Sequence, residues 1–352
     1  EYQTGANLHD SGVAGGHVGL MRTGTITDGQ SMDVKTVSAM RAAGGYAGTM
    51  ESGSASSFGS IQLFGDKGIK LDLGQMLDVA QVFVPVVKSS SVAGYRKGMK
   101  VVATGEDITH GTGNAGGYVG LAVGGQIWGD LGQNGQKLVK GVTAAGANVS
   151  NLRKVEGRNN VGGFIGKGNG KTDAETIIRN CYATGNVTGG AYTGGFAGGL
   201  WGLNIKNCYA SGNVSQAAAA MASFVGTDAS DSNYYGSITN CFTTGIVTGS
   251  SPFRYAFAEQ SSATKRSEIT NCYFAVENLG IKNQNESATE KPQDEMKNEA
   301  FAAALNGSDD SNGWSFVNGQ VLCGAEPADY SAVEAAKAAI PTDLTVYTDE
   351  SV

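Results

Sequence analysis

Apolar and polar side chains alternate in short stretches along most of this chain. In IRNCYATGNV (178–187), Ile178, Asn180 and Tyr182 point one way if the segment is a strand, and the residues between them point the other way. A helix would need apolar residues every three or four positions, and between residues 1 and 274 that pattern is absent apart from one stretch. The alternation therefore predicts short strands for most of the chain.

These stretches belong to repeats built from two units. The first unit is Gly-Gly-(aromatic or His)-x-Gly, with the copies GGHVG (15–19), GGYAG (44–48), GGYVG (116–120), GGFIG (162–166), GGFAG (194–198) and the weaker ASFVG (222–226) and YAFAE (255–259). The second unit contains Asn-Cys, with the copies IRNCYATGNVTG (178–189), IKNCYASGNVSQ (205–216), ITNCFTTGIVTG (238–249) and ITNCYFAVENLG (269–280). A repeat of about 30 residues, made of short strands and glycine corners with positive φ, predicts an all-β fold. We expect a right-handed parallel β-helix with coils about 4.8 Å apart.

Equivalent residues of stacked coils form ladders along the axis of such a fold. The two predicted ladders are Asn180, Asn207, Asn240 and Asn271, and Cys181, Cys208, Cys241 and Cys272. Parity does not decide which ladder lies inside, because corners and bulges shift the phase. We expect buried, reduced cysteines, since a free cysteine behaves as a small hydrophobe, although stacked thiols are also within reach of a disulfide. The asparagines then lie at a turn, where amide ladders bond between coils.

The chain divides into three parts. Residues 1–274 are predicted to form the β-helix of about seven repeats, with 53–104 as an irregular segment, a helix or loop inserted on one flank. Residues 275–325 are a capping segment with a helix in 291–306, which we expect to cover the last coil. Residues 326–352 are a linker and the first helix of an incomplete following module. The chain starts without methionine or a signal peptide, so we expect it to be covalently part of a longer multidomain chain.

Composition narrows the class of protein. Glycine contributes 54 of 352 residues, and 40% hydrophobic residues suffice for a long, thin core, which excludes wholesale disorder. A net charge of -7 and no basic stripe argue against a nucleic-acid partner. The most apolar run, residues 77–87, is short and contains Pro85, so no membrane insertion is expected in this segment.

Gly170-Lys171-Thr172 resembles a phosphate-binding loop at first sight. That loop needs a glycine five residues before Gly170, and this position is Ile165. The residues that follow suit a strand rather than the required helix. We therefore predict that the stretch is one repeat of the solenoid and binds no nucleotide.

The sequence shows no catalytic residues and implies no cofactor. Of three histidines, His17 occupies the aromatic position of the first unit, where a packing role is expected. There is no His-Glu-x-x-His or Gly-x-Ser-x-Gly, and no Cys/His spacing that binds zinc. No metal site is therefore predicted.

One loop combines acidic and aromatic side chains. In GTDASDSNYYG, Asp228 and Asp231 lie near Tyr234 and Tyr235. Parallel β-helices include carbohydrate-cleaving enzymes, and paired acids with aromatics cleave or hold sugars. These four residues are the candidate ligand-binding set, with a plain solvated loop as the alternative. Calcium bound through Asp228, Asp231 and Asn233 is a further alternative, although the glutamate and spacing of a known site are missing.

The repeats carry a family resemblance. GGFIG followed by IRNCYATGNVTGG, and GGFAG followed by IKNCYASGNV, resemble the GLUG motif of large bacterial surface proteins, which also accompanies immunoglobulin A-cleaving metallopeptidases of Gram-positive bacteria. The segment NEAFAAALN with GWSF resembles the usual end of such an array, and residues 330–352 look like the start of a FIVAR module of Gram-positive adhesins. The number of coils stays open, because the copies at 222 and 255 are weaker and the first three repeats lack Asn-Cys.

The resemblance implies an extracellular place on the bacterial cell surface and no catalytic residues. We therefore expect a non-catalytic adhesin or binding module that contacts an unknown host protein, glycan or cell. A purely structural stalk is the alternative, and a carbohydrate-active enzyme is a weaker one.

Overall fold

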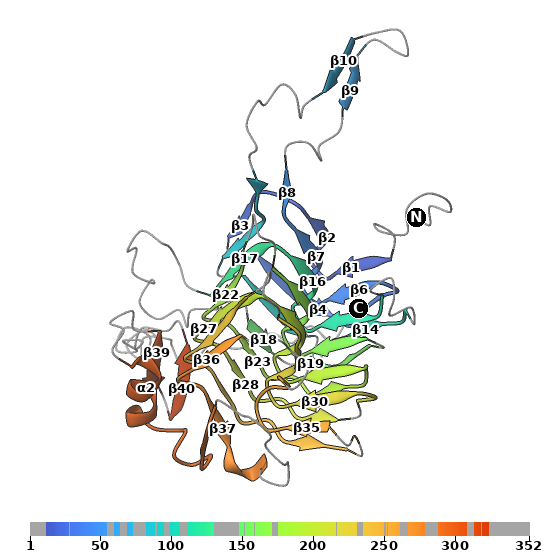
Figure 1. Ribbon diagram of the computed structural model, residues 1–352. Coiled ribbons are helices and arrows are strands. Elements are labelled where there is room, and N and C mark those ends of the chain that lie inside the picture. Colours follow the sequence, from blue (N-terminus) through green and yellow to red (C-terminus); the bar gives the residue numbers. More distant parts are fainter. Residues whose placement is uncertain are drawn as a thin grey trace, which may run out of the picture.

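The structure is a computed structural model, and it shows a parallel β-helix (Figure 1). The described residues are 12–27, 29–54, 60–63, 69–72, 82–88, 90–94, 99–105, 112–129, 148–150, 152–157, 159–170, 175–215, 217–230, 235–249, 251, 253–260, 267–278, 288–307, 313–317 and 319–323. The predicted module start, 326–352, lies outside them, as does Lys171. No helix among the described residues is long and apolar enough to cross a membrane.

Each coil contains up to five short strands, and equivalent strands of successive coils pair in parallel to form five sheets, named A to E in chain order. Sheet A contains β1 (Val13–Gly15), β6 (Ala42–Gly44), β15 (Asn114–Gly116), β20 (Asn160–Gly162), β25 (Tyr192–Gly194), β30 (Ala220–Ala222) and β35 (Phe253–Tyr255). Sheet B contains β2 (Val18–Met21), β7 (Ala47–Glu51), β16 (Val119–Val123), β21 (Ile165–Asn169), β26 (Ala197–Trp201) and β31 (Val225–Asp228). The seven strands of sheet A correspond to the seven copies of the first sequence unit.

The other three sheets complete the coils. Sheet C contains β3 (Thr25–Thr27), β12 (Val86–Lys88), β17 (Gly125–Trp128), β22 (Thr176–Arg179), β27 (Leu203–Lys206), β32 (Ser237–Thr239) and β36 (Glu268–Thr270). Sheet D contains β4 (Gln30–Val34), β13 (Ser91–Gly94), β18 (Asn148–Ser150), β23 (Tyr182–Ala183), β28 (Tyr209–Ala210), β33 (Phe242–Thr243), β37 (Tyr273–Ala275) and β38 (Thr289–Lys291). Sheet E contains β5 (Thr36–Ala39), β14 (Met99–Ala103), β19 (Leu152–Glu156), β24 (Val187–Thr188), β29 (Val214–Ser215) and β34 (Val247–Thr248).

A stack of rings runs through the core along the axis. Each ring comes from the third position of a Gly-Gly-x-x-Gly unit, and neighbouring ring centroids lie 4.7–4.9 Å apart in near-parallel planes. The members are His17, Tyr46, Tyr118, Phe164, Phe196, Phe224 and Phe257. All except His17 are fully buried. His17 thus has the expected packing role, at one end of the stack.

The glycines of these units serve close backbone approach, which corrects our expectation of positive φ. None of them has a positive φ. A Cβ on Gly44 would lie 1.9 Å from the carbonyl oxygen of Ala47, and one on Gly45 would lie 2.1 Å from that of Gly117 in the next coil. Only glycine allows the strands of sheets A and B to meet so closely at this corner.

The irregular segment is shorter than predicted. From Val86 onward, β12, β13 and β14 pair in parallel with the coils on both sides, with register shifts in β13 and β14, and Val87, Val92 and Val101 are fully buried. In β14, Met99, Val101 and Ala103 are buried, because every second side chain of a strand enters the core. Among the described residues of 53–104, the departure from the coils thus lies between β7 and β12.

Within that stretch, the described residues form antiparallel strand pairs in place of the expected helix or loop. β8 (Gly53–Ser54) pairs with β11 (Val82–Phe83), and β9 (Ser60–Leu63) pairs with β10 (Ile69–Asp72). Figure 1 shows β9 and β10 projecting away from the coils.

The predicted capping segment lies on the side of the β-helix, beside sheet D (Figure 1). It contains the 3₁₀ turn η2 (Val276–Asn278), the helix α2 (Glu299–Asn306) and a hairpin of β39 (Trp314–Val317) and β40 (Gln320–Cys323). Its buried Phe301, Trp314 and Cys323 pack on outward-facing rings of four successive coils, namely Tyr182, Tyr209, Phe242 and Tyr273. Without this segment the outward-facing rings would form an exposed apolar stripe, and the segment covers them.

Candidate binding surface

The Asn-Cys pairs turn the chain from sheet C to sheet D. The four asparagines have φ between 51° and 55°, a left-handed conformation that Asn adopts more readily than other side chains. Their amides bond in series: Asn207 Nδ2 donates to Asn180 Oδ1 at 3.0 Å, Asn240 to Asn207 at 3.3 Å and Asn271 to Asn240 at 2.9 Å. The ladder ends on the flank, where Asn271 also donates to the carbonyls of Ala304 and Leu305.

The four cysteines lie inside, and all are reduced and buried. Each thiol reaches back to the carbonyl two residues earlier, for example Cys181 Sγ to Arg179 O at 3.0 Å and Cys208 Sγ to Lys206 O at 3.2 Å. Burial raises the pKa of Cys208, Cys241 and Cys272 well above the usual thiol value. The structure thus brings all eight ladder residues together as a structural corner.

One member of the candidate ligand set is buried and engaged within the fold. Asp228 is fully buried, at an inward position that Leu200 occupies in the previous coil. Its oxygens accept hydrogen bonds from the backbone N–H and hydroxyl of Ser230, from those of Ser267 and from Gln260 Nε2. These hydrogen bonds satisfy the buried carboxylate within the fold, so it is not available to a ligand. Asp231, Asn233 and Tyr234 lie outside the described residues.

Tyr235, the other member of that set among the described residues, faces solvent, with 56% of its surface exposed. It follows the corner between sheets B and C, one residue before Gly236, whose Cβ position lies against the backbone of Leu203. Tyr235 thus precedes β32 at the B–C corner, as Gly202, which follows Trp201, precedes β27 of the preceding coil. Two aromatic residues therefore occupy this corner in neighbouring coils.

Trp201 is half-buried and has a cation on its ring. Lys167 Nζ lies 4.5 Å from the ring centroid, and the ring covers Gly199, where a Cβ would lie 2.8 Å from it. Burial lowers the pKa of the Lys167 amine, and the charge of Arg41 adds to this shift. The glycine at 199 leaves room for the ring, and the lysine holds it in place.

Polar side chains continue this surface along sheet C. Asn204 and Ser237 pair across neighbouring strands, and Ser237 Oγ donates to Asn204 Oδ1 at 3.0 Å. Asn204 Nδ2 in turn donates to Glu175 Oε2 at 3.3 Å. We define the B–C corner surface as Lys167, Trp201, Asn204, Tyr235 and Ser237.

A second tryptophan belongs to the fold rather than to a surface. Trp128 is 5% exposed, with Lys88 Nζ 4.7 Å and Arg179 Cζ 4.4 Å from its ring centroid. The three residues are neighbours in sheet C, at matching positions of successive strands. Sequence reasoning did not find these cation–ring stacks, because they need the strand register.

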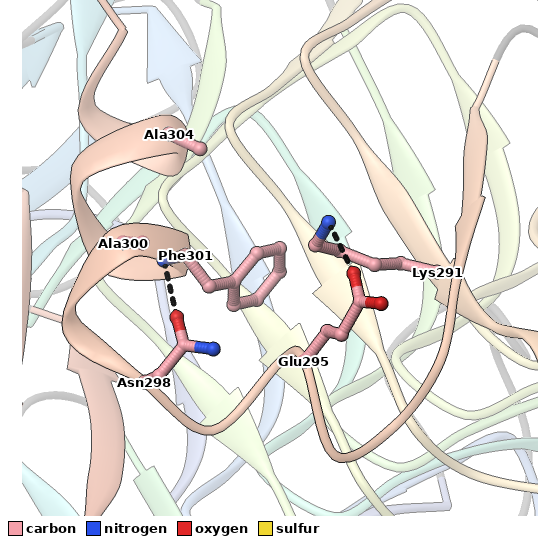
Figure 2. Close-up of a pocket in the computed structure, with 6 residues that line it drawn as sticks. All are labelled: Lys291, Glu295, Asn298, Ala300, Phe301 and Ala304. Atoms are coloured by element: carbon pink, nitrogen blue, oxygen red, sulfur yellow. Dashed lines mark hydrogen bonds and ion pairs between the residues drawn. The ribbon is translucent and has the colours of Figure 1, made fainter.

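A pocket of about 260 Å³ opens on the flank (Figure 2). Phe301 extends from α2 toward the ion pair of Lys291 Nζ and Glu295 Oε2, which are 3.0 Å apart. Asn298 caps the helix, with its Oδ1 accepting the Phe301 N–H at 2.8 Å, and Ala300 and Ala304 complete the wall. The pocket has the form of a small apolar hollow with one polar rim, and its single carboxylate is engaged by the lysine.

Among the described residues, no group of three or more His, Cys, Asp or Glu side chains is placed to hold a metal ion. The B–C corner surface offers aromatic rings for stacking and amide and hydroxyl groups for hydrogen bonding.

Comparison with known proteins identifies the repeat. The family model of the GLUG motif matches residues 157–188 and 189–215. The first match contains β20 to β24 and the second β25 to β29, so each matched unit is one complete coil. No curated protein matches the chain.

One solved structure is similar in part. It is the crystal structure of a protein named "putative immunoglobulin A1 protease" from Bacteroides ovatus, with 18% sequence identity. The alignment covers 88% of this chain and 76% of that chain, with a TM-score of 0.38. A TM-score of this size does not establish a shared fold.

Proposed function

We propose that this chain is a non-catalytic binding module of a larger bacterial surface protein and that it contacts a glycan on a host or neighbouring cell. The GLUG repeats support the surface-protein context, because the motif resembles that of large bacterial surface proteins. Each matched unit is a whole coil of the β-helix. The module is extracellular in this proposal, and further domains, including a FIVAR-like one, belong to the same protein.

The B–C corner surface carries the proposal. Tyr235 is 56% exposed at the corner that the half-buried Trp201 occupies in the preceding coil, and Asn204 and Ser237 add amide and hydroxyl groups on the strands that follow. Tyr and Trp supply large contact faces at low entropic cost and dominate binding energies at interfaces. A sugar ring presents a C–H face and hydroxyls, so it matches an aromatic face with hydrogen-bonding groups at its edge.

A glycan array tests the proposal. The parent chain is expected to bind a subset of glycans, and Tyr235→Ala should reduce retention about tenfold or more, as loss of an aromatic anchor does. Phe253→Ala is the matched control, because Phe253 is also 56% exposed but lies on sheet A. Bound glycans should be recovered intact after prolonged incubation.

The outcomes separate the alternatives. Equal loss in the two variants would show binding that does not use the B–C corner surface. No retention of any glycan by the parent would favour the stalk, a function supported by the continuous ring stack along the axis. Release of shortened glycans would favour the carbohydrate-active enzyme.

A further inference from the structure

Strand β38 has one open edge at the end of sheet D. It pairs in parallel with β37 on one side, and no described strand pairs with its other side. The N–H of Thr289 donates to the carbonyl of Cys272, toward β37. Since successive residues of a strand direct their backbone groups to opposite edges, the N–H and carbonyl of Glu290 face away from β37. Thr289 and Glu290 are exposed, and such an edge is a template for a further strand.

The apolar pocket of the flank lies on the outer side of this edge strand. The outward-facing rings of sheet D end at Phe242 and Tyr273, and the next position in register is Thr289 of β38. Phe301 packs edge-on against Tyr273, with ring centroids 5.2 Å apart, and lines the pocket together with Lys291 (Figure 2). An outward side chain of a strand added to β38 would therefore enter the hollow of about 260 Å³ beside Phe301.

The other face of the edge strand presents a carboxylate. Glu290 pairs with Phe274, whose side chain is buried in the core, but Glu290 itself is exposed. A basic side chain directly opposite Glu290 would stabilise the pairing, as opposite charges on neighbouring strands do. A strand that fits this edge therefore alternates basic residues toward Glu290 with apolar residues toward the pocket.

The segments that border the edge and the pocket are acidic. Residues 276–278 and 288–307 contain five carboxylates, all on exposed residues, and two lysines. Lys291 is already paired with Glu295 at 3.0 Å. The excess of negative charge favours a positively charged partner. The carboxylates are those of Glu277, Glu290, Asp294, Glu295 and Glu299, and the lysines are Lys291 and Lys297.

We propose that the open edge of β38 and the adjoining pocket bind an extended basic segment of a partner protein, which adds a strand to sheet D. A lysine or arginine of this segment lies opposite Glu290, and a neighbouring apolar side chain enters the pocket beside Phe301. Strand addition takes its affinity from main-chain hydrogen bonds and its specificity from pockets for alternate side chains. This contact lies on the flank and is independent of the glycan contact at the B–C corner surface.

A second copy of this chain fits the edge poorly. Symmetric antiparallel pairing of two β38 strands would place the Glu290 side chains of the two copies opposite each other, and like charges directly opposite are destabilising. Pro292 follows β38 at once and has no N–H, so the strand cannot be lengthened to compensate.

Fluorescence anisotropy with the 352-residue chain tests the proposal. The probe is a labelled synthetic peptide of alternating lysine and valine, and the control is a peptide of the same composition with all its lysines in one block. The alternating peptide should bind about tenfold or more tightly, because only it presents one basic and one apolar face as a strand. In the complex, hydrogen exchange at the Glu290 amide should slow, since that N–H becomes bonded.

Two alanines of α2 provide matched variants. Ala304 lines the pocket, whereas Ala303 is exposed on the same helix and does not line it. Ala304→Leu should fill the hollow and weaken binding about tenfold, and Ala303→Leu should change the affinity by less than about twofold. Glu290→Pro removes the N–H of the open edge and should abolish binding. All three variants should melt within about 3 °C of the parent, because the sites are exposed.

The outcomes decide the proposal. Equal binding of the two peptides would reduce the contact to net charge and overturn it, as would the absence of binding or unchanged exchange at Glu290. Equal loss of affinity in Ala303→Leu and Ala304→Leu would show that the pocket takes no side chain, which also overturns it. Self-association of the parent chain that Glu290→Pro abolishes would overturn it in favour of a second copy.

Discussion

At the scale of single residues, one asparagine in each of four coils has two roles at the corner between sheets C and D. It adopts the left-handed conformation that the turn needs, and its amide links neighbouring coils. In the third coil Gly129 stands at this corner, where its N–H donates to Arg179 as that of Asn180 donates to Lys206. Gly129 does not have a positive φ, so the left-handed conformation belongs to the four asparagine corners, where the amide ladder is added.

Substitutions at Asn240 should separate these two contributions. Asn240→Gly keeps the turn but loses the amide bonds, and should lower the free energy of unfolding by about 1 kcal/mol. Asn240→Ala also places an alanine in a left-handed conformation, which costs about 1–2 kcal/mol more. Urea unfolding of both variants measures the difference, and equal losses would contradict the role of φ.

The buried thiols should make stability fall in alkali. Burial raises the pKa of Cys208, Cys241 and Cys272 above 9.0, the ordinary value, which their thiols regain in the unfolded chain. Above that pH the folded state retains protons that the unfolded state loses, so stability present at neutral pH is lost as pH rises. Each cysteine should contribute a slope of about 1.4 kcal/mol per pH unit.

Urea unfolding between pH 8 and pH 10 measures this slope. Cys241→Ala should make the slope shallower by the share of one cysteine, whatever it does to stability at neutral pH. An unchanged slope would show that the Cys241 thiol ionises as easily in the folded protein as in the unfolded one.

The burial of Asp228 was not predictable from the sequence. GTDASDSNYYG reads as a polar loop, and its first carboxylate enters the core only because Ser230, Gln260 and Ser267 supply donors from two segments of chain. The burial of Cys181 and its equivalents was predictable, because their regular spacing places all four at the same position in the coil. Non-local partners account for the difference.

At the scale of elements, the alternation of side chains specifies the strands, whereas the partners of the flank segment needed the structure. The apolar residues of 291–306 indicate a helix, and Met296, Phe301 and Leu305 are indeed buried. An apolar face does not say which surface covers it. The outward rings Tyr182, Tyr209 and Phe242 form that surface only once the coils are stacked in register.

The B–C corner surface has the same dependence on register. The sequence singles out Tyr235 as part of an aromatic and acidic loop, but Trp201 lies 34 residues earlier in the chain. The two lie at the same corner of adjacent coils, one coil apart. One part of the B–C corner surface could therefore be predicted from a local sequence motif. The other part could be placed only once the pairing of β27 with β32 was known.

At the scale of the whole molecule, both glycan binding and a role as a stalk depend on coils stacked in one register. The ring stack takes one residue from each of seven coils, and the amide and thiol ladders take one residue from each of the last four. Contacts lie mainly between neighbouring coils, so stability is expected to accumulate coil by coil. The register determines what the outer surface offers to a ligand.

Disulfide trapping across neighbouring coils tests that register most directly. Asn204 lies opposite Ser237, and Lys206 lies opposite Thr239. Paired residues of adjacent parallel strands have Cα separations within the range of a disulfide. The double variant Asn204→Cys/Ser237→Cys should therefore form a bond on mild oxidation, detected as a linked peptide by mass spectrometry, while the native cysteines stay buried. The offset variant Asn204→Cys/Thr239→Cys should not, and equal or preferential bonding in the offset variant would contradict the stacking register of the β-helix.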